Sequence, residues 1–236
     1  MVRLSQRMQA LADMVTPGNV LCDVGCDHGF LPIYLVQKKI ISRAIAMDVA
    51  TGPLSAAKEH IASEGLSDKI STRLSDGLSE LGEAEADTVL IAGMGGGLVL
   101  HILSENPDRA KSLKELILQP QSELYEVRNF LFQEGYELLD EDMVLEDGKY
   151  YPMMKVRYGG EVTKREEPTE QQLYFGTFLI QRKHPVLKQY LLREMAVTEK
   201  VLKQLEAQPA TDVIEKRRQE VKSYRDLVEK TLEEMQ

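Results

Sequence analysis

Seven consecutive residues near the amino terminus combine two glycines with two carboxylates and a histidine. They are Asp23, Val24, Gly25, Cys26, Asp27, His28 and Gly29. A glycine-rich turn directly after the first strand of a βαβ unit lets the backbone approach a ligand closely, and the helix that follows presents free N–H groups. Dinucleotide dehydrogenases carry G-x-G-x-x-G at this place, whereas this turn contains G-x-D-x-G. By itself the run also fits a tight turn that binds nothing.

A third carboxylate, Asp48, stands nineteen positions beyond Gly29, at the end of the next apolar segment. A carboxylate there can accept both hydroxyl groups of a ribose. An exposed aspartate is often a mere turn former, but here the first motif dictates the spacing. An acidic residue two positions before the first glycine, as Asp23 is, is characteristic of S-adenosylmethionine-dependent methyltransferases. We therefore expect contacts to the methyl donor from Asp23, Gly25, Gly29, Asp48 and Val49.

The tripeptide Ser75-Asp76-Gly77 follows the third apolar segment. In methyltransferases an acidic residue at this place typically accepts the adenine amino group of the donor, and a glycine makes room for the ring. Taken alone, the tripeptide fits a solvated turn equally well. Within the whole pattern, Asp76 and Gly77 are predicted to bind the donor.

The fourth apolar segment is followed by Gly93-Met94-Gly95-Gly96. Methyltransferases that act on exocyclic amines usually carry an Asn- or Asp-Pro-Pro-aromatic box here, which grips a nitrogen whose lone pair is delocalised. Its absence favours another acceptor, such as a ring nitrogen with an in-plane lone pair. The alternative is a flexible loop that clears space for the donor, and Gly93 and Met94 are predicted to contact it.

Six runs of residues, spread over about positions 1 to 158, form a specific combination. They are Leu4-Ser5-Gln6-Arg7, the stretch from Asp23 to Leu35, Gly52-Pro53, Ser75-Asp76-Gly77, Ile91-Ala92-Gly93-Met94-Gly95-Gly96 and Leu116-Ile117-Leu118-Gln119-Pro120. This combination resembles the bacterial tRNA (adenine-22-N1)-methyltransferases, the TrmK family. The resemblance implies a Rossmann-like catalytic domain, a coiled-coil-like helical domain, S-adenosylmethionine as cofactor and tRNA as substrate.

Two positions depart from the family pattern. Gly29-Phe30 stands where members often have Ala-Tyr, and Gln121 stands where the motif often ends in asparagine. The first change is conservative for donor binding. The second leaves open how the Gln119-Pro120-Gln121 corner contributes to substrate binding.

The chemistry implied is the attack of an adenine N1 lone pair on an activated methyl group, which yields a cationic ring. A nearby carboxylate would stabilise the developing positive charge, and Asp27 is the candidate. Asp27 has two alternative roles, which are to cap the following helix or to bind the donor's amino group. His28 is a second catalytic candidate that also fits a donor-binding or a structural role. Arg7, on a helix that folds over the pocket, is expected to pair with the donor's carboxylate.

The elements that must position these residues follow an α/β pattern. Short aliphatic segments, typical of strands buried on both faces, are Val20 to Val24, Arg43 to Asp48, Ile70 to Leu74, Thr88 to Ala92 and Glu115 to Gln119. Helical stretches between and after them are Pro32 to Lys38, Pro53 to Ser63, Gly97 to Leu103 and Ser122 to Glu134. Two further strands, Glu137 to Glu146 and Lys149 to Tyr158, are joined by Asp147-Gly148, a strong hairpin signal. We predict a Rossmann-like class I methyltransferase fold, mostly parallel with an antiparallel terminal hairpin.

After Gly159-Gly160 the composition changes, and long helical periods are interrupted once near Pro209. Apolar positions recur at spacings near three and four, at Leu187, Leu191, Thr198, Leu202 and Leu205 and then at Ile214, Val221, Tyr224, Val228 and Leu232. We predict a catalytic domain over 1–160 and a helical hairpin, with coiled-coil-like character, over 161–236. Periodicity alone leaves open whether these helices pack on each other, on the catalytic domain or on a second subunit, so both a monomer and a homodimer are compatible.

Composition narrows the class further. The chain has 236 residues, no apolar run long enough to span a bilayer and no secretory leader pattern, so a cytoplasmic protein is expected. The only cysteines, Cys22 and Cys26, lack a second pair to complete a zinc site, and we expect them to be structural. No metal site is predicted.

The formal net charge of -9 is unfavourable for a nucleic-acid binder. From Glu161 onward, however, 14 acidic residues are balanced by 14 basic ones, so the negative surplus lies entirely in residues 1–160. This balance fits a solvated helical surface. If tRNA is the substrate, the same segment is interpreted as a neutral-to-basic arm beside an acidic body. The expected phosphate contacts are Lys183, Lys188, Lys200, Lys203, Lys216, Arg217, Arg218, Lys222 and Arg225.

Two other functions remain compatible with the sequence. A methyltransferase for a small molecule or a protein would suit the negative charge better. A non-catalytic module that binds S-adenosylmethionine and recruits partners through its helices is the alternative from another class.

Overall fold

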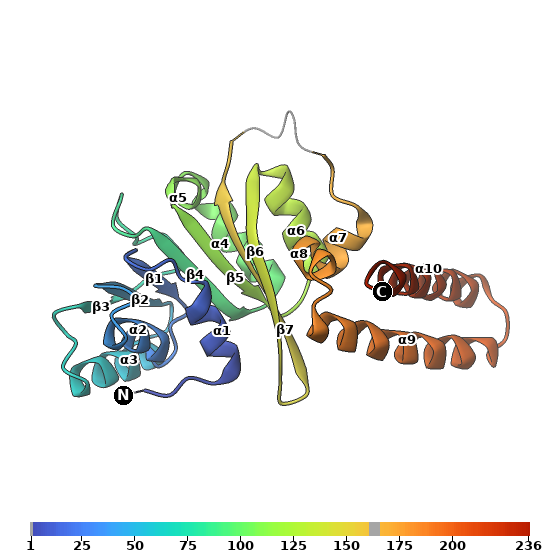
Figure 1. Ribbon diagram of the computed structural model, residues 1–236, viewed down its shortest axis with the longest axis horizontal. Helices are drawn as coiled ribbons and strands as arrows, with labels where there is room; N and C mark the ends of the chain where they lie inside the picture. The colour runs from blue at the N-terminus through green and yellow to red at the C-terminus, as the bar shows by residue number, and fades with distance from the viewer. Residues whose placement is uncertain (1, 161–165) are drawn as a thin grey trace. The chain divides into compact units, whose positions relative to one another are not determined.

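The computed structural model describes residues 2–160 and 166–236 and divides into two compact units, Met1–Glu166 and Glu167–Gln236 (Figure 1). The boundary predicted from the sequence, between 160 and 161, adjoins residues 161–165, which lie outside the described part. Among the described residues, no helix is both long and apolar enough to cross a membrane.

The first unit is built on a seven-stranded sheet in the order β3-β2-β1-β4-β5-β7-β6. Its strands are β1 (Leu21–Val24), β2 (Ala44–Asp48), β3 (Ile70–Leu74), β4 (Thr88–Met94), β5 (Glu115–Pro120), β6 (Tyr136–Glu146) and β7 (Lys149–Tyr158). The first five strands are parallel, and β7 is antiparallel to both β5 and β6. The predicted fold class and all seven predicted strands are confirmed, with ends that move by at most two residues.

Alternating side chains of the strands supply a core on each face of the sheet. Leu21 and Leu90 belong to one cluster, whereas their neighbours Cys22 and Val89 belong to the other. Because successive strand side chains point to opposite faces, a strand that is apolar throughout needs cover on both sides. Helices of the first cluster are α1 (Gln6–Met14), α2 (Phe30–Gln37) and α3 (Thr51–Ser63), and those of the second are α4 (Gly96–Glu105), α5 (Pro107–Ser112) and α6 (Leu124–Gln133). The short α5 was not expected from the sequence.

The β6–β7 hairpin turns at Asp147 and Gly148, as predicted, with φ angles of 49° and 74°. Two residues with positive φ are what a two-residue type I′ turn requires. Leu118 of β5 is paired with Met154 of β7. The part of the hairpin that precedes Met154 therefore projects beyond the carboxyl end of β5, and α1 packs against the hairpin.

The end of α1 is fastened to the sheet by Glu115, the first residue of β5. Its carboxylate accepts hydrogen bonds from the backbone N–H of Thr16 (3.0 Å) and from the hydroxyls of Thr16 (2.6 Å) and Thr88 (2.7 Å). Lys155 lies 2.9 Å from the same carboxylate and also donates to the carbonyl of Met14. Burial opposes the charged form of Glu115, but the hydrogen bonds from Thr16, Lys155 and Thr88 outweigh it and lower the pKa of Glu115.

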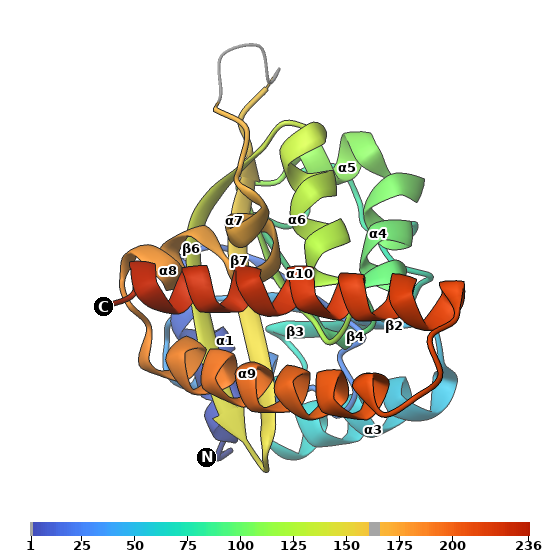
Figure 2. The same cartoon turned by 90° about the vertical axis from the view of Figure 1, so that its right-hand side faces the viewer.

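The second unit consists of helices throughout its described elements. They are α7 (Glu170–Phe175), α8 (Thr177–Gln181), α9 (Pro185–Glu206) and α10 (Asp212–Glu234). The two long helices lie side by side and pack on each other, as Figure 2 shows. The helical hairpin is thus confirmed, and its helices bury Leu187, Leu191, Thr198, Leu205, Val221, Val228 and Thr231. Leu202, Ile214, Tyr224 and Leu232 are half-buried.

The short helices α7 and α8 were not expected, although α7 has a sequence signal. Thr169 and Gln172 form a capping box, in which each side chain bonds to the other residue's backbone. In the folded unit Gln171 of α7 is buried and donates to the Thr231 hydroxyl of α10 (3.2 Å). The short helix therefore completes the core of the helical unit.

Removing the carboxylate of Glu115 tests the fastening of α1. We expect Glu115→Ala to lower the free energy of unfolding by about 3 kcal/mol, because it leaves the Lys155 ammonium and the Thr16 N–H without their acceptor. Urea denaturation measures this change. Lys114→Met is the control: its pair with Asp87 is solvent-exposed and should contribute less than about 1 kcal/mol. Equal effects of the two substitutions would contradict the assignment.

Candidate active site

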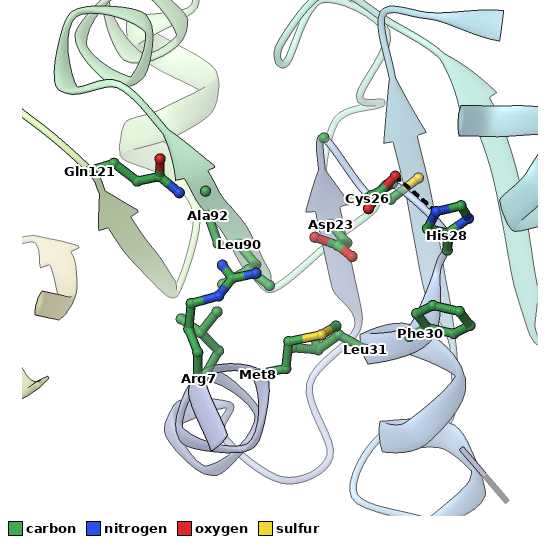
Figure 3. A pocket seen from close by; sticks show the side chains of 14 residues that line it. Arg7, Met8, Asp23, Cys26, His28, Phe30, Leu31, Leu90, Ala92 and Gln121 are labelled. Carbon is green, nitrogen blue, oxygen red and sulfur yellow. Dashed lines mark ion pairs between the residues drawn. The ribbon is translucent and has the colours of Figure 1, made fainter. Parts of the chain in front are cut away.

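A hollow of about 350 Å³ opens at the carboxyl ends of β1 and β4. The strand order reverses between these two strands, and open α/β sheets bind ligands at such a switch point. The volume is at the low end of the roughly 300–1,000 Å³ typical of small-molecule sites. Its lining residues, ten of them labelled in Figure 3, are Arg7, Met8, Leu11, Asp23, Gly25, Cys26, Asp27, His28, Phe30, Leu31, Leu90, Ala92, Gly93 and Gln121.

Asp23 lies at the end of β1 and is only 6% exposed. Burial raises the pKa of its carboxyl to about 7, and the negative charges of Asp48 and Asp27 add to the effect. Among the described residues, none forms a hydrogen bond or an ion pair with this carboxylate. A buried acid without a partner is costly, so the hollow favours a ligand that brings a positive charge to Asp23.

Arg7 enters the same hollow from α1 (Figure 3). Ser5 caps this helix by accepting from the Met8 N–H. The Arg7 guanidinium donates from Nη1 to the side-chain oxygen of Gln119 (3.0 Å) and lies 5.4 Å from the centre of the Tyr151 ring. The structure places Arg7 on an amino-terminal helix and at the hollow, where the sequence predicted it, and its pairing with the donor's carboxylate stays a prediction.

The turn after β1 depends on two glycines in the left-handed region. Gly25 and Gly29 have φ angles of 74° and 70°, which side chains rarely tolerate. A Cβ at Gly29 would also lie 3.3 Å from the Cβ of Ala57 on α3. Gly29 therefore lets α2 and α3 approach closely, and it does not line the hollow itself.

Asp27 and His28 lie on the wall of the hollow and are largely exposed, with 74% and 46% of their side chains accessible. Their side chains approach to 3.5 Å. The cap of α2 is Gly29, with no side-chain hydrogen bond to the first turn. This rules out helix capping by Asp27 and leaves its roles toward the donor or the developing charge.

An aromatic stack stands beside the turn. The ring of Phe30 lies 5.4 Å from that of His28 and 5.0 Å from that of His60 on α3. Nδ1 of His60 is 3.0 Å from the carbonyl oxygen of His28. The stack thus fixes the position of the His28 backbone.

The remaining predicted donor contacts lie at the ends of β2 and β3, outside this hollow. Asp48 accepts a hydrogen bond from the Ala50 N–H (2.9 Å), and Val49 is 67% exposed. Asp76 and Gly77 line a separate hollow of about 70 Å³ with residues of α4. Asp48 is the last residue of β2 and the other three follow the end of β2 or β3, as predicted, but the structure does not bring them into one cavity with Asp23.

The glycines at and after the end of β4 have different roles. Gly93 lines the hollow, and its N–H donates to the side-chain oxygen of Gln119 (3.2 Å). A Cβ at Gly96 would lie 2.4 Å from the carbonyl oxygen of Ser122, so Gly96 permits a close backbone contact with the loop after β5. Met94 lies outside the hollow, and its methyl group lies where a side chain of Gly25 would be, only 2.2 Å from that Cβ position.

Sequence reasoning missed the apolar walls of the hollow. These are Met8, Leu11, Phe30, Leu31, Leu90 and Ala92, together with Cys26. Apolar residues on strands and helices are predicted to belong to the hydrophobic core. The sequence holds no signal that separates those that face a cavity from those that pack in the core. The two glutamines of the Gln119-Pro120-Gln121 corner differ in position. Gln121 lines the hollow, whereas Gln119 is fully buried behind it.

The antiparallel β6–β7 hairpin and the carboxylates that end β1 and β2 define a Rossmann-like methyltransferase. Comparison with known proteins specifies which one. The family model described as "TrmK: tRNA (adenine(22)-N(1))-methyltransferase" matches residues 21–231, and the chain belongs to this family.

Individual relatives agree with the family match. A tRNA (adenine(22)-N(1))-methyltransferase of Bacillus subtilis is 34% identical over 229 residues, which cover 97% of this chain and 95% of the relative. The crystal structure of the B. subtilis m1A22 tRNA methyltransferase TrmK superposes with a TM-score of 0.87 at 31% identity, covering 98% of this chain and all of that one. A Streptococcus pneumoniae protein, solved in complex with S-adenosyl-L-methionine, gives a TM-score of 0.86 at 31% identity with the same coverage.

The buried charge of Asp23 predicts how stability changes with pH. The ordinary pKa of this carboxyl is 3.8 and the folded protein raises it to about 7, so between these values the folded chain holds a proton that the unfolded chain releases. Stability from this group therefore falls as the pH rises through that window. We expect Asp23→Asn, in the absence of ligand, to be more stable than the parent at pH 8 by about 1 kcal/mol or more.

Urea denaturation at pH 5 and pH 8 checks this prediction, and the gain should be smaller at pH 5. Asp68→Asn, at an exposed position, is the matched control and should change little at either pH. A loss of stability in Asp23→Asn at pH 8 would show that the carboxylate is satisfied within the fold.

Proposed function

We propose that this protein transfers the methyl group of S-adenosylmethionine to N1 of adenine 22 in tRNA. The family match over residues 21–231 and the 34% identity to the B. subtilis enzyme support the proposal. The observation in the molecule that carries it is a pair of opposite charges in one hollow. Among the described residues, no side chain pairs with Asp23 and no carboxylate lies within ion-pair distance of Arg7. An amino acid end with an ammonium and a carboxylate complements this pair.

The donor's amino acid end is assigned to these two residues. Asp23 accepts the ammonium, which offsets the cost of a buried charge, and Arg7 pairs with the carboxylate. The backbone at Gly25, which lines the hollow, admits close approach of the ligand. Asp48 with Val49, and Asp76 with Gly77, follow β2 and β3 at the same edge of the sheet and are assigned to the ribose and the adenine.

The acceptor enters beside the glycine-rich loop after β4. When bound, the donor supplies a methyl group that is already activated on a sulfonium. The protein's task is to hold the adenine N1 in line with that methyl group and to exclude water. No residue has to remove a proton, because N1 of neutral adenine carries a free lone pair. Gly93 leaves the approach open, since no neighbouring atom lies closer than 3.6 Å to its Cβ position.

Asp27 is assigned to the charge that develops on the methylated ring. Its carboxylate stands on the wall of the hollow and is not consumed by helix capping. An anion near the forming cation lowers the barrier most if it is positioned beforehand, and His28, 3.5 Å away, orients it. His28 and Phe30 also offer stacked rings next to the hollow, a surface on which an unstacked base can rest.

The helical unit is proposed to bind the tRNA backbone. An adenine inside a folded arm must be unstacked at a cost of a few kcal/mol, which phosphate contacts offset. On α10 the arginines are already paired: Arg217 with Glu220, Arg218 with Glu215 and Arg225 with Asp226. On α9, Lys200 and Lys203 border a shallow hollow of about 430 Å³, and no ion pair in the described part of the chain involves either. Lys183, Lys188, Lys216 and Lys222 likewise have no ion pair in the described part of the chain, and Lys200 and Lys203 are chosen for the test because both border this one hollow. Because tRNA is the substrate, we place the protein in the cytoplasm.

Transfer of label from methyl-labelled donor to transcribed tRNA, followed by nucleoside analysis, tests the function. We expect N1-methyladenosine in tRNA and none in a transcript that carries guanine at position 22. Label in a protein or a small molecule alone would favour the first alternative function. Donor binding without any transfer would favour a non-catalytic module, once a second tRNA substrate has given the same result.

Charge reversal on α9 tests the tRNA surface. We expect Lys200→Glu with Lys203→Glu to weaken tRNA binding at least about tenfold and to reduce the slope of log K against log salt by about 2, since each lost phosphate contact removes about one unit. Filter binding at several salt concentrations measures both quantities. Lys58→Glu with Lys69→Glu makes the same charge change on the first unit and should leave the slope unaltered. An unchanged slope in the α9 variant would contradict the proposal.

A further inference from the structure

Gln119, near the end of β5, holds two walls of the hollow with one atom. Its side-chain oxygen accepts from Nη1 of Arg7 at 3.0 Å and from the N–H of Gly93 at 3.2 Å. The side chain is fully buried, and its nitrogen donates to the carbonyl of Pro120 at 3.4 Å. Every polar atom of the amide is therefore used, and the amide is fixed in one orientation.

The hydrogen bond from Arg7 to the neutral amide of Gln119 leaves the positive charge of Arg7 unneutralised. A guanidinium has five N–H donors in a planar fork, and only one of them is used by the amide oxygen. Among the described residues the guanidinium of Arg7 has no charged partner: the Tyr151 ring faces it, and the Glu146 carboxylate accepts from the Arg7 backbone N–H (3.2 Å) rather than from its side chain. The positive charge of Arg7 thus stays available to an anionic group.

We propose that Gln119 is a positioning residue that aims Arg7 at the carboxylate of the methyl donor and ties it to Gly93, beside which the acceptor enters. This inference rests on the proposed function. The hydrogen-bond acceptor of Arg7 must be neutral for this role. A glutamate at position 119 would keep the geometry but would form an ion pair with Arg7 and so neutralise its charge. The shared oxygen also links the sites of the donor and the acceptor. A donor that binds Arg7 stabilises the position of Gly93 as well, because both residues donate to the same Gln119 oxygen.

The test compares S-adenosylmethionine with its decarboxylated form, which keeps the ammonium and lacks only the carboxylate. Calorimetry of the parent protein should show at least about tenfold tighter binding of the carboxylate-bearing ligand, as a charge-assisted pair provides. Gln119→Glu should reduce this preference to about twofold or less and leave the affinity for the decarboxylated ligand nearly unchanged. Gln119→Leu should raise the KM for the donor through the loss of the tether.

Gln6→Glu is the matched control, because it makes the same change one residue from Arg7 at an exposed position in the first turn of α1. Its preference for the carboxylate should equal that of the parent. A double-mutant cycle then separates positioning from general damage to the pocket. If Gln119 acts on the donor through Arg7, Arg7→Met and Arg7→Met with Gln119→Leu must bind the donor equally well.

A carboxylate preference that survives Gln119→Glu would overturn the proposal, and so would an additional loss in the double variant. A folded parent protein that binds no donor at all would instead overturn the proposed function. Thermal denaturation of each variant confirms that the comparison concerns folded proteins.

Discussion

The active-site hollow depends on the way α1 is held along one face of β5. Glu115, Ile117 and Gln119 alternate on the strand and so share a face, which spans about 13 Å at 3.3 Å per residue. The nine residues of α1 rise by about the same distance at 1.5 Å each. Glu115 accepts from Thr16 beyond one end of the helix, Gln119 accepts from Arg7 near the other, and Ile117 shares a core cluster with Leu11 between them. This match of lengths fixes both the position and the rotation of the helix.

Two opposite charges are kept apart by this arrangement. Arg7 is bound to the neutral amide of Gln119, and Asp23 is buried at the end of β1 without a partner. Had they formed an ion pair, each would have satisfied the other. The raised pKa of Asp23 reflects the free-energy cost of burying its charge, and a zwitterionic ligand offsets this cost on binding. The unliganded protein is therefore less stable than it would be with Asp23 paired, and in exchange the site is preorganised for its ligand.

The second unit separates the task of holding a long polyanion from that of binding a small cation. The acidic surplus of the chain lies in residues 1–160, where it suits a positively charged donor. The helical hairpin carries balanced charge, and its arginines are largely paired along their own helix, whereas Lys200 and Lys203 are not. Electrostatic attraction toward phosphate therefore falls on the lysines of the helical unit rather than on its paired arginines.

The sequence by itself determined the strands, the longer helices and their order along the chain, but not the short helices α5, α7 and α8. Aliphatic strand runs, the Asp147-Gly148 turn and the helical periods after Pro185 are local signals, and the strand ends follow from them within two residues. The run from Asp23 to Gly29 and the carboxylates after β2 and β3 were readable because parallel strands end at one edge of the sheet. Only the tertiary structure decided that Asp27 does not cap α2, that Gly96 serves a contact with Ser122, and that Gln119 joins Arg7 to Gly93. The contacts of Gly96 and of Gln119 join residues 26 to 112 positions apart in the chain, whose meeting depends on packing between elements and leaves no periodic trace in the sequence.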